Sequence, residues 1–453
     1  MSDSFDLAVR GGTVVGPRGR AELDLYVEDG KVAALLPRAE RRPAAREIDA
    51  DGALVLPGGV DTHVHFMDPG DPSRETFLSG TAAAAARGVT TVVEHTHGWP
   101  VHEVARLEEK LAHLRGRAHV DFGLAAHVWP DRLDQIPGLW RGGIAFFKAF
   151  TCETHGVPAI DADVMTRLAE ALVELGAPCL IHCEDDAVTA GNERRLREAG
   201  RDDFGIVPAW RSREAELVSV ATVAAIAARV GARMVVAHAS DAEVLDLVAR
   251  ERAAGADLRA ESCPQYLYLH EAEVLAEGPF RKFTPPARIR SEVDERQMWD
   301  RFDSGAIHHI SSDHAPATRA QKTESDIWHV HFGLPGIDTT YPVMLDAALR
   351  GRTSLERVVE AYCERPAQLY GLRGKGRLEP GRDADLAIVD PGGSWTVSDE
   401  DVISAAGWSP YAGRELRGRV VTTVLRGEPI AAGDAPEGEP GGRFVPGPGG
   451  EEA

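Results

Sequence analysis

The sequence predicts an α/β protein, a (β/α)8 TIM barrel with a small β-sandwich domain built from both ends of the chain. The middle of the chain, residues 53–375, alternates short apolar runs with amphipathic helical patterns, whereas both ends carry strand patterns. Eight βα units over about 320 residues fit such a barrel. An open, doubly wound sheet is the alternative, but no Gly-x-Gly-x-x-Gly pattern follows the first apolar run.

The two ends of the chain, residues 1–52 and 376–432, are predicted to form the composite sandwich. Apolar residues alternate with polar ones from Leu23 to Val27, and Asp29-Gly30 then leads into a second apolar run. This pattern is typical of a β-hairpin. Residues 433–453 are rich in Gly, Pro and Glu, and we expect this tail to be disordered.

Within the barrel region, short apolar runs predict the strands and periodic patterns predict the helices. The predicted strands are the run Leu54–Pro57 before the first histidines, then 90–93, 120–125, 144–149, 178–182, 234–238, 258–262 and 307–312. The clearest helical patterns are 164–175, 215–229, 242–253 and 293–302.

Composition excludes several classes of function. The 453 residues are 43% hydrophobic and 27% charged, with a net charge of −21, which argues against nucleic acid or an anionic membrane as partner. No apolar run approaches the roughly 18 residues that a membrane span needs. The first residues show no basic and apolar signal pattern, and the five cysteines are unpatterned. We expect a reduced, cytoplasmic protein.

His63 and His65 are the most informative residues of the chain. They are spaced by one residue directly after an apolar run. Side chains on a strand alternate between its faces, so both imidazoles should point the same way. Neutral histidine is a common ligand of first-row metal ions. Two satisfied core histidines would be the alternative if the rest of the chain offered no further ligands.

Further residues of metal-binding type lie at or near the ends of other predicted strands: Lys148, His182, His238 and Asp313. The C-terminal ends of barrel strands converge on one mouth, where the active sites of such barrels lie. We therefore expect these four side chains to face His63 and His65.

The order His-x-His, Lys, His, His, Asp resembles that of the amidohydrolase superfamily. The surrounding stretches resemble its cyclic amidase branch, which includes dihydroorotases, allantoinases, dihydropyrimidinases and hydantoinases. The matching stretches are Asp61–Phe66, Glu261–Leu267, Pro285–Arg288, Gly333–Ile337, Gly381–Leu386 and Gly413–Gly418. The resemblance covers about residues 5–430.

The resemblance implies two divalent ions, usually zinc, and an enzyme that opens a cyclic amide or ureide ring. The ligands would be His63, His65 and Asp313 for one ion and His182 and His238 for the other, with Lys148 bridging both. Lys148 would bridge as a carbamate formed with CO2, because a bare ammonium cannot bind a cation. The ions would activate a hydroxide that attacks the ring carbonyl. Asp313 would carry the proton from the water to the leaving ring nitrogen.

Departures from the family patterns bear on which ring is opened. Dihydroorotases have an arginine two residues after the second histidine, where this chain has Met67, and a histidine where it has Ala317. Both contact the substrate carboxylate, so their loss argues against dihydroorotate. Hydantoinases place an oxyanion-binding tyrosine five residues after the lysine, where this chain has Glu153. This favours an allantoinase-like enzyme.

Four residues are predicted to contact or shape the substrate: Met67, His97, Thr284 and Phe332. His97 lies in the unusual stretch Glu94-His95-Thr96-His97, where relatives have a Met-Pro-Asn-like sequence. We expect His97 to contact the substrate, although it and His95 could be loop histidines without a role. Thr284 and Phe332 match positions where hydantoinases contact the ring, largely through the main chain.

The predicted function is therefore that of an allantoinase-like, zinc-dependent hydrolase, acting on a small cyclic amide as a homodimer or homotetramer. Dihydropyrimidinase or hydantoinase activity is the second interpretation, and dihydroorotase the third. A non-catalytic scaffold with this fold is the alternative from another class. Such scaffolds generally lose metal ligands, whereas all six positions are kept here.

Overall fold

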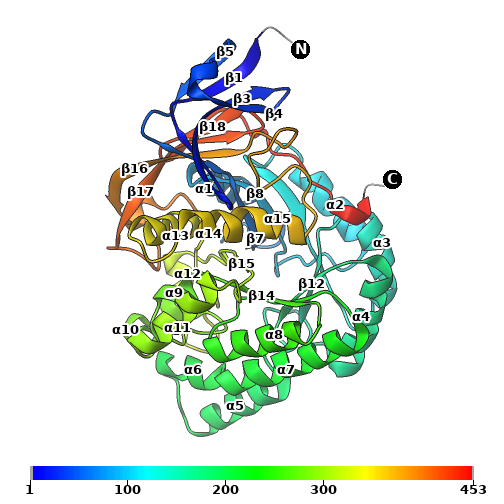
Figure 1. The fold of residues 1–453 in the computed structure, drawn as a ribbon. Helices are drawn as coiled ribbons and strands as arrows, with labels where there is room; N and C mark the ends of the chain where they lie inside the picture. Colours follow the sequence, from blue (N-terminus) through cyan, green and yellow to red (C-terminus); the bar gives the residue numbers. More distant parts are fainter. Residues whose placement is uncertain (1–3, 451–453) are drawn as a thin grey trace.

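The computed structural model describes residues 4–450, and its centre is a barrel of parallel strands (Figure 1). The barrel strands are β7 (Gly59–Val64), β8 (Val89–Glu94), β9 (Asp121–Leu124) continuing into β10 (Ala126–His127), β11 (Phe147–Phe150), β12 (Cys179–His182), β13 (Met234–Val236), β14 (Leu258–Ser262) and β15 (His309–Ile310). The last strand meets the first where the His65 amide donates a 2.8 Å hydrogen bond to the His314 carbonyl. The predicted TIM barrel is confirmed.

Helices follow the barrel strands and cover their outer side (Figure 1). They are α1 (Phe77–Ala86), α2 (Val104–Leu114), α3 (Ile136–Arg141), α4 (Ala162–Leu175), α5 (Asp186–Glu198), α6 (Val207–Trp210), α7 (Arg213–Val230), α8 (Ala242–Ala253), α9 (Gln265–Tyr268), α10 (Ala272–Glu277), α11 (Glu292–Asp303), α12 (Arg319–Thr323), α13 (Thr340–Leu349), α14 (Leu355–Val359) and α15 (Arg365–Leu369). None of those within residues 4–450 is both long and apolar enough for a bilayer crossing.

Local sequence explains where the helices begin and end. The Asp161 carboxylate accepts a 2.9 Å hydrogen bond from the Val164 amide at the start of α4, and Gly176 ends that helix with φ of 65°. In α1, Gly80 lies against the Phe66 ring so closely that a Cβ would overlap it. This close approach lets α1 pack directly against Phe66, the residue after His65.

Strands from both ends of the chain form one ten-stranded sheet with a hydrophobic core of its own. Its strands are β1 (Phe5–Arg10), β2 (Thr13–Gly16), β3 (Gly19–Glu28), β4 (Lys31–Pro37), β5 (Ala44–Asp49), β6 (Leu54–Pro57), β16 (Leu386–Thr396), β17 (Glu415–Leu425), β18 (Glu428–Ala432) and β19 (Ala435–Pro436). The predicted hairpin is the antiparallel pair β3–β4. Blue and orange strands meet at the top of Figure 1.

The strand Leu54–Pro57 was predicted in the barrel but belongs to the terminal sheet. It is β6, which pairs with β2 and β16, and the strand that carries His63 is β7. The run Leu54–Pro57 is apolar and fully buried, as expected of a barrel strand, whereas β7 is also fully buried but carries Asp61, Thr62 and His63, so hydrophobicity pointed to the wrong run. The chain passes from the sheet to the barrel at Gly58, where a Cβ would overlap the Thr90 side chain.

The tail was predicted to be disordered, but in its described part β19 pairs with β18, and residues 442–450 pack against the barrel. The Phe122 amide donates to the Arg443 carbonyl at 2.9 Å, and the Val445 amide donates to the Phe122 carbonyl at 2.7 Å. Gly442 approaches the Val120 carbonyl so closely that a Cβ there would overlap it. Composition alone missed this, because glycine also permits close backbone packing. Residues 451–453 lie outside the described residues.

A buried ion cluster joins the barrel to the terminal sheet. The Lys375 ammonium lies 2.6 Å from Asp121 on β9, 2.9 Å from Asp385 and 2.9 Å from Asp383. The three carboxylates are close enough to hold a cation, and Lys375 already supplies one. This cluster therefore has a structural role.

Candidate active site

The six predicted metal ligands line one cavity at the C-terminal ends of the barrel strands. His63, Lys148 and His182 lie on β7, β11 and β12, and His65, His238 and Asp313 follow β7, β13 and β15; all six line the cavity. Strand ends far apart in the sequence thus bring imidazoles, an amine and a carboxylate together, as expected for a barrel.

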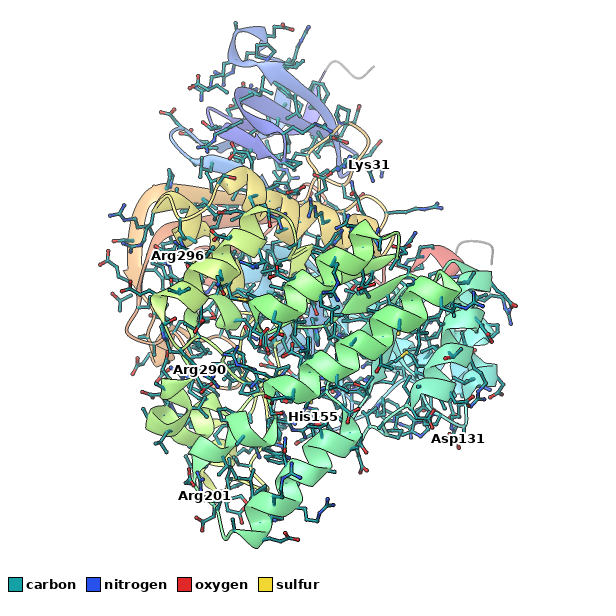
Figure 2. The ribbon with its side chains drawn as sticks, turned by 60° about the horizontal axis from the view of Figure 1, so that its bottom comes forward. Lys31, Asp131, His155, Arg201, Arg290 and Arg296 are labelled. Atoms are coloured by element: carbon teal, nitrogen blue, oxygen red, sulfur yellow. The ribbon has the colours of Figure 1, made fainter. Side chains whose placement is uncertain are left out.

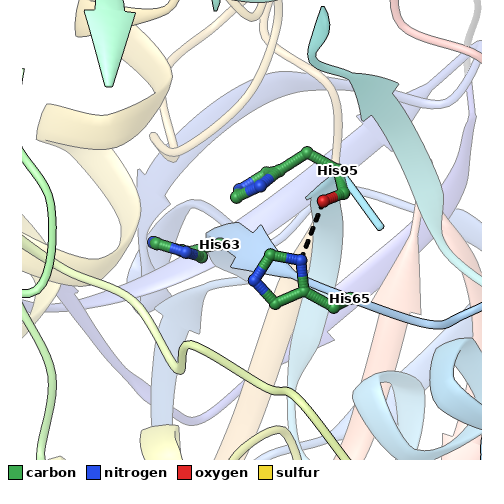
Figure 3. A group of neighbouring side chains, drawn as sticks. All are labelled: His63, His65 and His95. Atoms are coloured by element: carbon green, nitrogen blue, oxygen red, sulfur yellow. Dashed lines mark hydrogen bonds between the residues drawn. The ribbon is translucent and has the colours of Figure 1, made fainter. Parts of the chain in front are cut away.

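The first group of predicted ligands gathers around Asp313. Its Oδ1 atom lies 3.2 Å from Nε2 of His63 and 3.5 Å from Nε2 of His65. The other ring nitrogens are engaged, Nδ1 of His63 with Glu261 at 2.9 Å and Nδ1 of His65 with the His95 carbonyl at 2.8 Å (Figure 3). Such contacts fix the orientation of each ring and leave the lone pair of Nε2 free to bind a metal ion.

The second group is formed by His182 and His238. Nδ1 of His182 lies 3.0 Å from Nε2 of His238, and Nε2 of His182 pairs with Glu184 at 2.7 Å. Burial would raise the pKa of Glu184, but Arg211 and His182 outweigh it and lower the pKa to about 2. A permanent carboxylate therefore orients the His182 ring.

Lys148 lies between these groups without a hydrogen bond. Its side chain is 1% exposed, and Nζ has no hydrogen-bond partner among the described residues. Burial lowers the pKa of Lys148, against the opposing effect of Glu261 and Asp313. A buried, unpartnered amine among imidazoles and a carboxylate fits a position that a bound group completes. The whole donor set fits divalent first-row ions.

Two of the six residues adopt a left-handed backbone conformation. The φ angles of His238 and Asp313 are 38° and 49°. Non-glycine residues rarely adopt this region, at a cost of about 1–3 kcal/mol each, and they cluster at functional sites. The conformation turns the chain at the strand end and leaves both side chains lining the cavity.

Three of the four predicted substrate contacts line the same cavity, and the fourth does not. Thr284, Phe332 and His97 are lining residues, and the Thr284 hydroxyl donates to Glu184 at 2.7 Å. Met67 is buried elsewhere, with its sulfur 3.1 Å from the Thr96 hydroxyl. The φ angle of Met67 is 55°, so the alternation of side chains along the strand does not continue to this residue. Its position two residues after His65 therefore did not predict where its side chain points.

His155 is a lining residue that sequence reasoning missed. It lies in the loop after β11 with φ of 55°, and its ring stacks on His97 at 4.5 Å with an interplanar angle of 8°. Figure 2 shows it inside the outline of the molecule, with Asp131 and Arg201 nearer the edge. No spacing rule marked it, because irregular loop backbone decides where it points. Glu184 and Glu261 were also missed as partners, although acidic residues in apolar strand ends were a usable signal.

Comparison with known proteins identifies the family of this chain. The Amidohydrolase family model matches residues 54–430. An allantoinase from Rubrobacter xylanophilus is 38% identical to this chain, over 98% of this chain and 98% of the relative. An allantoinase from Streptomyces avermitilis is 35% identical, over 98% of this chain and 99% of the relative.

Among solved structures, the L-hydantoinase (dihydropyrimidinase) from Arthrobacter aurescens superposes with a TM-score of 0.92 at 30% identity. The superposition covers 98% of this chain and all of that one. Length, fold and sequence thus agree over nearly the whole chain. The chain therefore belongs to the amidohydrolase family and is an enzyme of its cyclic amidase branch.

Proposed function

We propose that this enzyme opens the ring of a neutral cyclic ureide, with allantoin the leading candidate, and that it does so with two zinc ions. The observation that carries the proposal is that one cavity is lined by Lys148, Asp313 and six histidines, among them the four predicted as metal ligands. Similarity to allantoinases along the full chain supports the choice of allantoin.

The residues of the cavity divide into two sets of ligands. His63, His65 and Asp313 would hold one ion, and His182 and His238 the other. The two ions, when bound, would lower the pKa of a shared water and polarise the carbonyl of the ring.

Lys148 would join the two sets as a carbamate. Its lowered pKa favours the neutral amine, which is the form that attacks CO2. A bond forms between Nζ and carbon, one proton leaves, and the product presents two carboxylate oxygens. These oxygens suit two neighbouring cations as a glutamate would.

Asp313 would carry the proton. Burial would raise the pKa of Asp313, but His63 and His65 outweigh it and lower that pKa. The resulting carboxylate can accept a proton from the attacking water and deliver it to the ring nitrogen that leaves.

The preference for a neutral ring rests on the charge of the cavity lining. Among the described residues that line it, no arginine is present, and the single lysine, Lys148, is the proposed carbamate. A carboxylated ring such as dihydroorotate would lack the charge-assisted, bidentate partner that makes such pairs strong. Similarity to hydantoinase structures supports hydantoins and dihydrouracil as the second class of substrate.

A ring-opening screen combined with metal analysis tests the proposal. The zinc-loaded protein would be assayed with allantoin, hydantoin, dihydrouracil, dihydroorotate and succinimide, with metal content from plasma emission spectroscopy. We expect a neutral ring to exceed dihydroorotate in kcat/KM by about tenfold or more, or roughly 1.4 kcal/mol. Dihydroorotate as the best substrate would reject this specificity. A protein that binds no metal and opens none of the rings would instead be a non-catalytic scaffold.

A further inference from the structure

His95, directly after β8, is a buried histidine whose ring nitrogens are both unpartnered. Its side chain is 1% exposed, and neither Nδ1 nor Nε2 has a hydrogen-bond partner among the described residues. Buried polar atoms are normally paired, and leaving them unpaired is costly. A group other than these side chains is therefore needed to satisfy this imidazole.

The His95 ring faces the two histidines of the first ligand group (Figure 3). Its centroid lies 4.5 Å from that of His63 and 4.6 Å from that of His65. One ring nitrogen from each of the three residues lies within 4.8 Å of the others, a spacing that one metal ion can bridge.

The main chain of His95 takes part in the same arrangement. Its carbonyl accepts the hydrogen bond from Nδ1 of His65 at 2.8 Å, so that Nε2 of His65 is left facing Asp313. One residue thus orients a ligand through its backbone and brings a further imidazole to the ligand group through its side chain.

We propose that His95 is an additional ligand of the ion held by His63, His65 and Asp313, an inference that rests on the proposed binuclear site. This ion then has three imidazole ligands, whereas the ion at His182 and His238 has two. The first ion is therefore held more tightly than the second, and the ion at His182 and His238 dissociates first.

His127 provides a matched control. It is 2% exposed and both of its ring nitrogens are also unpartnered, but its ring centroid lies 6.2 Å from that of His95. It is not part of the cluster of His63, His65 and His95. Phenylalanine preserves the ring at either position, and His95 already packs edge-on against Phe146 at 5.6 Å.

The test compares zinc retention in the full-length wild type, His95→Phe and His127→Phe proteins. Each is loaded with zinc and dialysed against a graded chelator, and the remaining zinc is measured by plasma emission spectroscopy. The same comparison in a His238→Ala background isolates the first ion. We expect His95→Phe to lower the affinity for the first zinc ion by about tenfold or more. His127→Phe should retain zinc as the wild type does.

Equal retention in His95→Phe and the wild type overturns the inference. If the wild type holds two zinc ions and opens a ring while His95→Phe retains both equally, the inference fails and the proposed function stands. A wild type that binds no zinc rejects the proposed function itself.

A second measurement uses the wild type alone, and so decides the matter even if His95→Phe does not fold. The protein is labelled with 15N-histidine and loaded with 113Cd, and histidines whose ring nitrogens couple to cadmium are counted. Five coupled histidines are expected, those at positions 63, 65, 95, 182 and 238. Four, with no coupling at His95, would reject the ligand role.

Discussion

The Nε2 atom of His63 lies 3.2 Å from Oδ1 of Asp313, so the first and last strands of the barrel meet at one carboxylate. The second carboxylate near His63, that of Glu261, pairs with Nδ1 on the opposite side of the ring at 2.9 Å. His63 is thereby fixed between two acidic residues with different roles. Glu261 orients the ring, and Asp313 faces the cavity.

Replacing Asp313 by asparagine separates ligand binding from proton transfer. The amide keeps the shape of the side chain but cannot accept a proton from water, so kcat should fall by about 10²–10⁴. Zinc at His182 and His238 should remain, because Asp313 is not among the ligands proposed for it. Steady-state kinetics and metal analysis of the same sample check both parts. A variant that keeps a tenth of the wild-type rate would exclude Asp313 as the proton carrier.

Replacing Lys148 by alanine tests the bridging role. The change removes the one group proposed to bind both ions, so we expect loss of most of the zinc and nearly all turnover. Short carboxylic acids such as propionate should restore part of the activity, because they supply two oxygens in the space vacated by the side chain. Metal content measured with and without propionate follows this directly. Normal zinc content and rate in Lys148→Ala would end the binuclear model.

Much of the fold and the gathering of the predicted ligands could be predicted, because local periodicity indicates the strands and barrel geometry brings their ends together. The spacing of His63 and His65 places both on one face of a strand, and barrel geometry then brings in residues as distant as Asp313. No comparable rule covers irregular backbone. The positive φ of Met67 and His155 sends one side chain away from the cavity and the other into it.

Other errors came from patterns that two different structures share. The apolar run of β6 has the pattern of a buried barrel strand but lies in the terminal sheet, and the barrel strand is the more polar β7. The Gly-rich tail has a composition typical of disorder, yet Phe444 packs against Phe122 with ring centroids 5.9 Å apart. In both cases long-range contacts decide the outcome, and no local window contains them.

The pH dependence of stability should include a contribution from Glu216 on α7. Burial and the nearby Asp241 raise its pKa to about 8, even though Ser240 donates to its carboxylate. A carboxyl group with a raised pKa in the folded state stabilises the fold below its unfolded pKa of 4.5, and this contribution is lost as pH rises toward 8. Stability from this group therefore falls across that interval.

The Glu216→Gln variant should remove this dependence, since glutamine mimics the protonated acid. Relative to the wild type, its melting temperature should rise between about pH 4.5 and pH 8 and then level off. Glu214→Gln, an exposed substitution in the same helical turn, is the control. Because the pKa of Glu214 is lowered, this residue stays ionised between about pH 4.5 and pH 8 and adds no pH dependence there. Thermal melts at closely spaced pH values measure the difference. A constant offset between Glu216→Gln and the wild type would contradict a raised pKa.

The packing of the tail leads to a prediction about two adjacent glycines. A Cβ at Gly442 would overlap the Val120 carbonyl and lie 2.8 Å from the Ala118 carbonyl, which accepts the Gly442 amide. A Cβ at Gly441 would meet only the Glu439 carbonyl, at 3.9 Å. Neither glycine has a positive φ, so steric contact alone distinguishes the two sites.

Gly442→Ala should therefore displace the tail from β9, with a loss of about 1–3 kcal/mol in the free energy of unfolding, as for other overpacked sites. Gly441→Ala should leave that free energy unchanged. Denaturant melts of the two variants give the comparison, and limited proteolysis should cut the Gly442→Ala tail first. Equal stability of the two variants would mean that the tail does not hold to β9 in solution, and the prediction of disorder from composition would stand after all.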